Sequence, residues 1–190
     1  KLVFFIWFYL HSLWNNGSIM ANTFEQITTV TVGSGGASSI DFTSIPQTYT
    51  DLVIKTSARN TSTSTTMYVE FNGSGGTAYS VRILYGDGSA AGSTSSSSRA
   101  NIKNDGGADD SGYTANTFAN SEIYIPNYTS SNYKPVSIDG VPENNATTTY
   151  MNMAAGLWSS TSAISSIKLT LYAGNFAQYS TATLYGIKNS

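Results

Sequence analysis

The stretch that decides the fold class is residues 165–190, which read SSIKLTLYAGNFAQYSTATLYGIKNS. Apolar and polar residues alternate from Ser166 to Leu171, and β-branched, aromatic and small residues run from Tyr179 to Ile187. Alternation with a period of two is typical of a half-buried β-strand. Since the turn signal Gly174-Asn175 lies between the two runs, the pattern predicts a β-hairpin whose second strand pairs inside a sheet.

Short runs of the same kind recur through the rest of the chain, separated by turns rich in Gly, Ser and Asn. Thr66 to Asn72 alternates especially well, whereas no segment keeps a helical period over about ten residues. About ten short strands without helices predict an all-β protein, built as an antiparallel β-sandwich of the jelly-roll kind. We expect residues 20–190 to form this sandwich as a single domain.

One segment, Gly86 to Gly112, departs from this pattern. It is rich in Gly, Ser and Asp, and Ile102 is its only large apolar residue. The composition predicts a long irregular loop, and loops of this length inside a compact domain are usually functional or disordered. We therefore expect an interaction surface there.

The composition excludes several classes of function. Charged residues make up 11 % of the chain, against roughly 25 % in soluble domains, and the net charge is −2. Without a run of Lys or Arg, no nucleic-acid partner is expected. The chain has no Cys, and its one histidine is His11. Residues 20–190 therefore lack the imidazole that a Ser-His-Asp triad or a histidine-bound zinc requires, and we expect no enzyme activity and no cofactor.

Residues 1–19 differ sharply from the rest, because nine apolar side chains follow one another from Leu2 to Leu10. Nine residues are too few to span a bilayer, which needs about 20, so no membrane span is expected. Three interpretations remain open. The stretch is the apolar part of a signal peptide, it is sequence upstream of a natural start at Met20, or it is an arm that docks on a neighbouring subunit.

Exposed aromatic residues are candidates for a binding surface, since sugars stack on flat rings and hydrogen-bond to nearby Asn, Asp and Thr. The candidates for a glycan or partner site are Tyr113, Tyr124, Tyr128, Tyr133 and Trp158. Tyrosine is also an ordinary strand residue, so packing across strands is the competing interpretation for each of them.

Two sets of carboxylates have a chemical interpretation. Asp105, Asp109 and Asp110 form the one acidic cluster, and hard oxygen ligands on a Gly-rich segment suit Ca²⁺, although the register of an EF-hand is missing. Glu70 and Glu122 lie in strand runs and are the only pair we consider for a glycosidase. Solvated turns and solvent-facing strand positions are the competing interpretations.

Three segments resemble virion structural proteins of tailed bacteriophages from environmental samples. They are Ile45–Ile54 (IPQTYTDLVI), Tyr124–Tyr128 (YIPNY) and Ser180–Ile187 (STATLYGI). The resemblance covers most of the chain from Met20 onward, and its motifs are structural rather than catalytic. The apolar residues before Met20 do not belong to it.

The resemblance implies a jelly-roll-like tail-fibre, spike or capsid-decorating protein, and it brings no catalytic residues with it. The implied location is the virion, or the secreted fraction if residues 1–19 are a signal peptide. The expected partners are further copies of the chain, in a homo-oligomer such as a trimer, and other virion proteins. The alternative function is a carbohydrate-binding module with a host-surface glycan as its partner.

Overall fold

The computed structural model describes residues 23–145 and 149–188. These residues form twelve strands and no helix, so nothing in them is a helix able to cross a membrane. The strands are β1 (Phe24–Thr31), β2 (Ser39–Phe42), β3 (Asp51–Ala58), β4 (Met67–Phe71), β5 (Tyr79–Gly86), β6 (Ala91–Arg99), β7 (Ile102–Asn104), β8 (Ala119–Ile125), β9 (Lys134–Val141), β10 (Met151–Trp158), β11 (Ile167–Leu171) and β12 (Thr181–Ile187).

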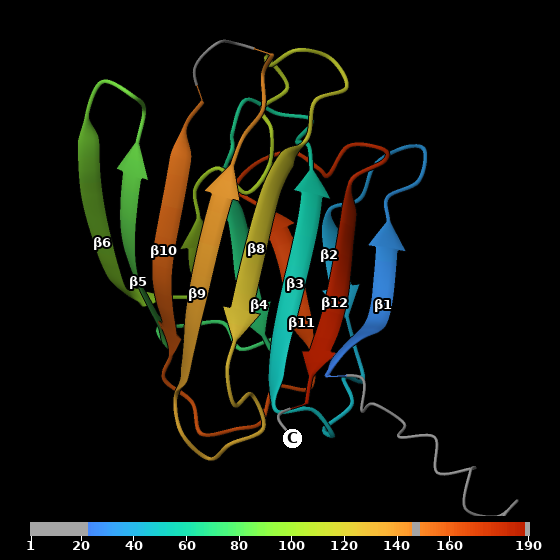
Figure 1. Cartoon of the computed structure of the whole chain (residues 1–190), viewed down its shortest axis with the longest axis vertical. Helices are drawn as coiled ribbons and strands as arrows, with labels where there is room; N and C mark the ends of the chain where they lie inside the picture. The colour runs from blue at the N-terminus through green and yellow to red at the C-terminus, as the bar shows by residue number, and fades with distance from the viewer. Residues whose placement is uncertain (1–22, 146–148, 189–190) are drawn as a thin grey trace, which may run out of the picture.

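The strands form two packed antiparallel sheets, which confirms the all-β sandwich predicted from the sequence. The large sheet has eight strands in the order β1-β12-β3-β8-β9-β10-β5-β6, and the small sheet has four in the order β2-β11-β4-β7. Figure 1 shows the large sheet in front and the small sheet behind it. The expectations for residues 1–19 lie outside the described residues.

The strand order is that of a jelly roll with two insertions. Without β5, β6, β9 and β10, the remaining eight strands, renumbered along the chain, have the orders 1-8-3-6 and 2-7-4-5, which is the arrangement of a two-sheet jelly roll. The hairpins β5–β6 and β9–β10 pair with each other through β5 and β10. We call these four strands the extension, because they widen the large sheet beyond β8.

The predicted C-terminal hairpin is wrong, although both of its strands exist. β11 pairs with β2 and β4 in the small sheet, and β12 pairs with β1 and β3 in the large one. The connection crosses between the sheets, and its Phe176 is fully buried and exchanges two backbone hydrogen bonds with Ala37. Alternation identifies a strand, but it does not identify the neighbouring strand.

The predicted long loop from Gly86 to Gly112 is also wrong, because it contains β6 and β7. All nine residues of β6 are exposed or half-exposed, and eight of them are small and uncharged. A strand with both faces in water needs no apolar face, so it leaves no periodic signal in the sequence.

The core lies between the two sheets and is filled from alternate strand positions. Leu52, Ile54 and Ile123 point inward from the large sheet and meet residues such as Val69 and Leu169 of the small sheet. The opposite face of each strand points to solvent, as expected for antiparallel sheets covered on one side only. The outer face of the large sheet is therefore the broad surface on which to look for a site.

Candidate functional site

The outer face of the large sheet changes character from the jelly roll to the extension. One cross-strand row in register runs through Thr29, Thr183, Lys55, Glu122, Asp139, Met153, Leu84 and Ser93. Its first five members, on β1, β12, β3, β8 and β9, are polar or charged, and the apolar Met153 and Leu84 lie on β10 and β5 of the extension. Strands β10 and β5 of the extension thus place two apolar side chains in a row whose other members, including Asp139 of β9 and Ser93 of β6, are polar.

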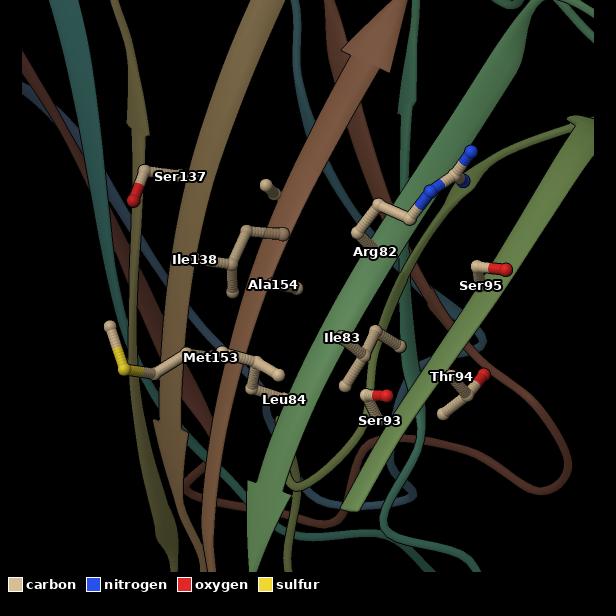
Figure 2. Close-up of a pocket in the computed structure, with 11 residues that line it drawn as sticks. Arg82, Ile83, Leu84, Ser93, Thr94, Ser95, Ser137, Ile138, Met153 and Ala154 are labelled. Carbon is tan, nitrogen blue, oxygen red and sulfur yellow. The ribbon is translucent and has the colours of Figure 1, made fainter. Parts of the chain in front are cut away.

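A shallow hollow of about 530 Å³ lies on this face of the extension (Figure 2). The residues that line it are Arg82, Ile83, Leu84, Ser93, Thr94, Ser95, Ser137, Ile138, Met153, Ala154 and Ala155. Large side chains from β5 and β10 flank it, while the small Ser95, Ser137 and Ala155 leave space between them. The lining is therefore amphipathic, with one cation, several hydroxyl groups and six apolar residues, of which Leu84 and Met153 are large and exposed.

The exposed apolar residues beside the hollow form one patch across three adjacent strands. Leu84 is 62 % exposed, Met153 51 %, Met151 45 % and Val141 40 %. Met153 and Leu84 are direct cross-strand partners. We call these four residues the outer apolar patch. Contiguous exposed apolar surface with a polar rim is typical of a contact site.

The methionines of β10 face outward because asparagine takes the inner position between them. Asn152 is buried, and its Nδ2 donates to Asn104 Oδ1 of β7 at 3.3 Å. Asn104 in turn donates to Ser121 Oγ on β8 at 2.9 Å. This buried polar network holds the extension against the small sheet, so the apolar side of β10 is left to solvent.

Three charged side chains lie next to one another in the same row of the outer face. Lys55 Nζ lies 2.8 Å from Glu122 Oε2, and Glu122 is the cross-strand partner of Asp139. Partial desolvation, together with the nearby charge of Glu122, raises the pKa of Asp139. Glu122 raises the pKa of Lys55. Exposed ion pairs of this kind contribute little free energy.

A second, smaller hollow of about 190 Å³ lies where loops meet at one end of the sandwich. We call it the loop-end hollow, and it is lined by Asp87, Tyr113, Pro142, Asn144, Thr149 and Tyr150. The ring of Tyr150 stacks on Tyr85 with centroids 6.1 Å apart. Burial raises the pKa of Tyr150, and Asp105, Tyr85, Asp87 and Tyr113 raise it further. Burial also raises the pKa of Tyr113. The hydroxyl groups of Tyr113 and Tyr150 are therefore neutral at physiological pH and can form hydrogen bonds.

The five aromatic residues proposed from the sequence do not share one surface. Tyr113 lines the loop-end hollow. Tyr124 is half-buried and donates to Asp51 Oδ2 at 2.9 Å, and the buried Tyr128 donates to the carbonyl of Pro46. Trp158 lies in the core against Phe71 and Tyr79. Tyr133 is exposed in the loop between β8 and β9.

The three aspartates proposed as calcium ligands have separate structural partners. Asp105 forms an ion pair with Lys103 at 2.7 Å and accepts from Thr66 Oγ1. Asp109 is fully buried and accepts from the backbone nitrogen of Glu143. Asp110 accepts from the backbone nitrogen of Gly112. Across residues 23–145 and 149–188, no group of three or more His, Cys, Asp or Glu is placed to hold a metal.

The two glutamates considered for a glycosidase lie on opposite sides of the molecule. Glu70 is on β4 of the small sheet and Glu122 on β8 of the large sheet, and each occupies a half-exposed position between buried neighbours. Both side chains therefore point away from the core in opposite directions. They do not face each other across a cleft, which paired acid–base catalysis requires.

The outer apolar patch and the hollow beside it were not found from the sequence. The sequence alternates between Thr147 and Trp158, with Tyr150 and Asn152 against Met151 and Met153, but a period of two does not tell which of its faces is buried. Compared with known proteins, the chain matches no family model, no curated protein and no solved structure.

Proposed function

We propose that this protein is a non-enzymatic structural component of a bacteriophage virion, as a tail-fibre, spike or capsid-decorating protein that assembles in several copies. The outer apolar patch is the observation that carries the proposal, because exposed patches with polar rims mark contact surfaces. Its rim includes Ser93, Ser95 and Ser137. A neighbouring copy can cover such a surface with the desolvation of few charged groups.

Two further observations favour a virion over another assembly. Jelly rolls are common in capsid and lectin domains, which supports the proposal by analogy of fold alone. The segments Ile45–Ile54, Tyr124–Tyr128 and Ser180–Ile187 resemble phage structural proteins, and in this fold they lie in or beside β3, β8 and β12. These three strands are neighbours in the large sheet, so the resemblance concerns one connected part of the jelly roll.

The test is the mass of the purified protein in light scattering after size-exclusion chromatography at micromolar concentration. We expect a multiple of the 20.2 kDa chain. The double variant Leu84→Lys/Met153→Lys places two charges in the patch and should lower the mass, because copies that join through the patch separate. Ser57→Lys, at an exposed outer-face position on β3, is the matched control and should keep the wild-type mass. A wild-type monomer at these concentrations would contradict assembly in several copies.

A second candidate function, carbohydrate binding, is favoured by the loop-end hollow. Two tyrosines, an aspartate and an asparagine line a space of about 190 Å³, and rings with a few convergent polar groups are typical of small-ligand sites. Binding on a glycan array that is lost in both Tyr113→Ala and Tyr150→Ala would support it. Tyr172→Ala removes an exposed tyrosine elsewhere and should leave the binding intact. An array without a signal would remove this candidate.

A further inference from the structure

We infer that strand β6 pairs with β6 of a second copy, antiparallel and about a two-fold axis near Ser95, so that the two large sheets become one. The inference rests on the proposed assembly in several copies and names the edge through which two copies join. Figure 1 shows β6 at the end of the large sheet, farthest from β1.

β6 has a longer regular and uncharged run than the other three sheet edges, although it too has a register shift near its end. The edge strands of the small sheet, β2 and β7, have four and three residues. β1 has a bulge between Gln26 and Thr28 and the charged Glu25, which lies 3.4 Å from Lys188. Short length, bulges and charges are the features by which natural edge strands avoid added strands.

β6 has nine residues, and from Ala91 to Ser98 it contains no charge and no proline. Its pairing with β5 is regular from Gly86↔Ala91 to Val81↔Ser96, and the register shifts only beyond that point, near Ser98 with its φ of 55°. The backbone groups on its other side have no neighbouring strand within the described residues. A regular, uncharged edge of this length is a template for another strand.

The charges around β6 favour a second copy in the antiparallel direction. Asp87 lies in the turn before the strand, and Arg99 is its last residue. Backbone and side-chain hydrogen bonds from Ser89 and Ala90 lower the pKa of Asp87, so it is ionised at neutral pH. Parallel pairing would place Asp87 beside Asp87 and Arg99 beside Arg99 of the second copy, whereas antiparallel pairing about Ser95 keeps these like charges apart.

The remaining cation near β6 does not oppose this arrangement. Arg82 is the cross-strand partner of Ser95, and its Nη1 donates to the carbonyls of Val81 and Ser96 at 3.0 and 3.3 Å. Across the two-fold axis, the two Arg82 backbones would be three strand spacings apart, about 14 Å. Charges at that separation are largely screened at physiological salt. About an axis at Ser95, the residues from Gly92 to Ser98 face one another, and they are Ser, Thr and Gly with small side chains.

The absence of cysteine makes the inference directly testable. A residue on the two-fold axis of an antiparallel pair has a Cα–Cα distance of about 4.5 or 5.5 Å to its copy, which is within the range for a disulfide. We would make the single variants Ser93→Cys, Thr94→Cys, Ser95→Cys and Ser97→Cys, oxidise them mildly and quantify disulfide dimers. Ser57→Cys, an exposed serine on β3 five strands away in the sheet, is the control.

We expect the fastest disulfide formation at Ser95 or its immediate neighbour, at least about tenfold faster than for Ser57→Cys. Ser95→Lys should weaken association at least about tenfold, since like charges directly opposite each other are unfavourable. Its urea unfolding midpoint at a concentration where the wild type is monomeric should be unchanged, which separates a lost contact from a lost fold.

The outcomes distinguish this inference from the proposed function. An even number of copies with disulfides centred on β6 supports both. A trimer, or any oligomer in which the β6 cysteines react no faster than Ser57→Cys, overturns the β6 pairing and leaves assembly in several copies standing. A wild-type monomer contradicts the assembly itself, and the pairing with it.

Discussion

At the scale of single residues, Asp109 is the most deeply buried acidic side chain among the described residues. It is fully buried, and one of its carboxylate oxygens accepts from Glu143 N at 2.8 Å. Its backbone bonds to Ala58 and Asn60 at the end of β3. Asp109 thus links β3 to the loop between β9 and β10. Burial disfavours the ionised form of its carboxyl group.

The pKa of Asp109 makes a prediction about pH. Burial raises this pKa above the ordinary 3.8, against the opposing effects of its hydrogen bonds and of Arg59. A carboxyl with a higher pKa in the folded state binds more protons there, so its contribution to stability falls as pH rises from about 4 through the raised pKa. Asp109→Asn removes this contribution. The unfolding free energy of the wild type minus that of the variant should therefore decrease with rising pH in urea titrations, and a constant difference would contradict the prediction.

At the scale of elements, β12 depends on a glycine that makes room for an aromatic ring. A Cβ on Gly186 would lie 2.3 Å from Cγ of Tyr49, whose hydroxyl donates to Glu25 at 2.9 Å. Lys188 Nζ lies 5.2 Å from the centre of the same ring. Glu25 and Lys188 thus fix the position of the Tyr49 ring, which packs against β12 at Gly186. The Leu184-Tyr185-Gly186-Ile187 motif needs its glycine for this packing.

Gly186→Ala should therefore destabilise the protein by about 1–3 kcal/mol, the usual range for overpacking. Gly33→Ala is a matched control, because a Cβ there meets nothing within 4 Å and the backbone is not in the left-handed region. It should change the unfolding free energy by no more than about 0.5 kcal/mol. Chemical denaturation of both variants measures the difference, and equal effects would show that Tyr49 moves aside freely.

Pairing between elements is also where sequence-based prediction failed. The two strands of the supposed C-terminal hairpin were located correctly, yet they lie in different sheets, and the buried Phe176 of their connection pairs with Ala37. β6 went unnoticed because its exposed Ser and Thr side chains carry no apolar period. For the C-terminal strands, the missing information is a long-range contact, which neither alternation nor turn residues encode.

At the scale of the whole molecule, the burial of the strands in the large sheet decreases from its central strands to its edge strand β6. β3, β8 and β12 each have a neighbour on both sides and inward side chains with no exposure, such as Ile54, Ile123 and Leu184. β6 has one neighbouring strand and two solvent-facing surfaces. Local opening is easiest where few buried contacts must break.

Hydrogen exchange should follow this gradient. In dilute solution, we expect amides of β6 to exchange fastest among the strands and those of β3, β8 and β12 slowest, as measured by mass spectrometry of peptic fragments. If β6 pairs with a second copy, its protection should rise with protein concentration, while that of the opposite edge, β1, should not. Protection of β6 in dilute monomer that equals that of β8 would contradict this gradient.

The sequence by itself determined the all-β class, most strand positions and the absence of histidine and cysteine chemistry from residues 20–190, because alternation and composition are local properties of the chain. Only the tertiary structure decided which strands are neighbours, that Asn152 rather than Met153 faces inward, and that Tyr113 and Tyr150 meet at one hollow. The physical reason is that backbone hydrogen bonds pair any two strands equally well. The choice among partners and faces comes from filling one shared core, to which all strands contribute at once.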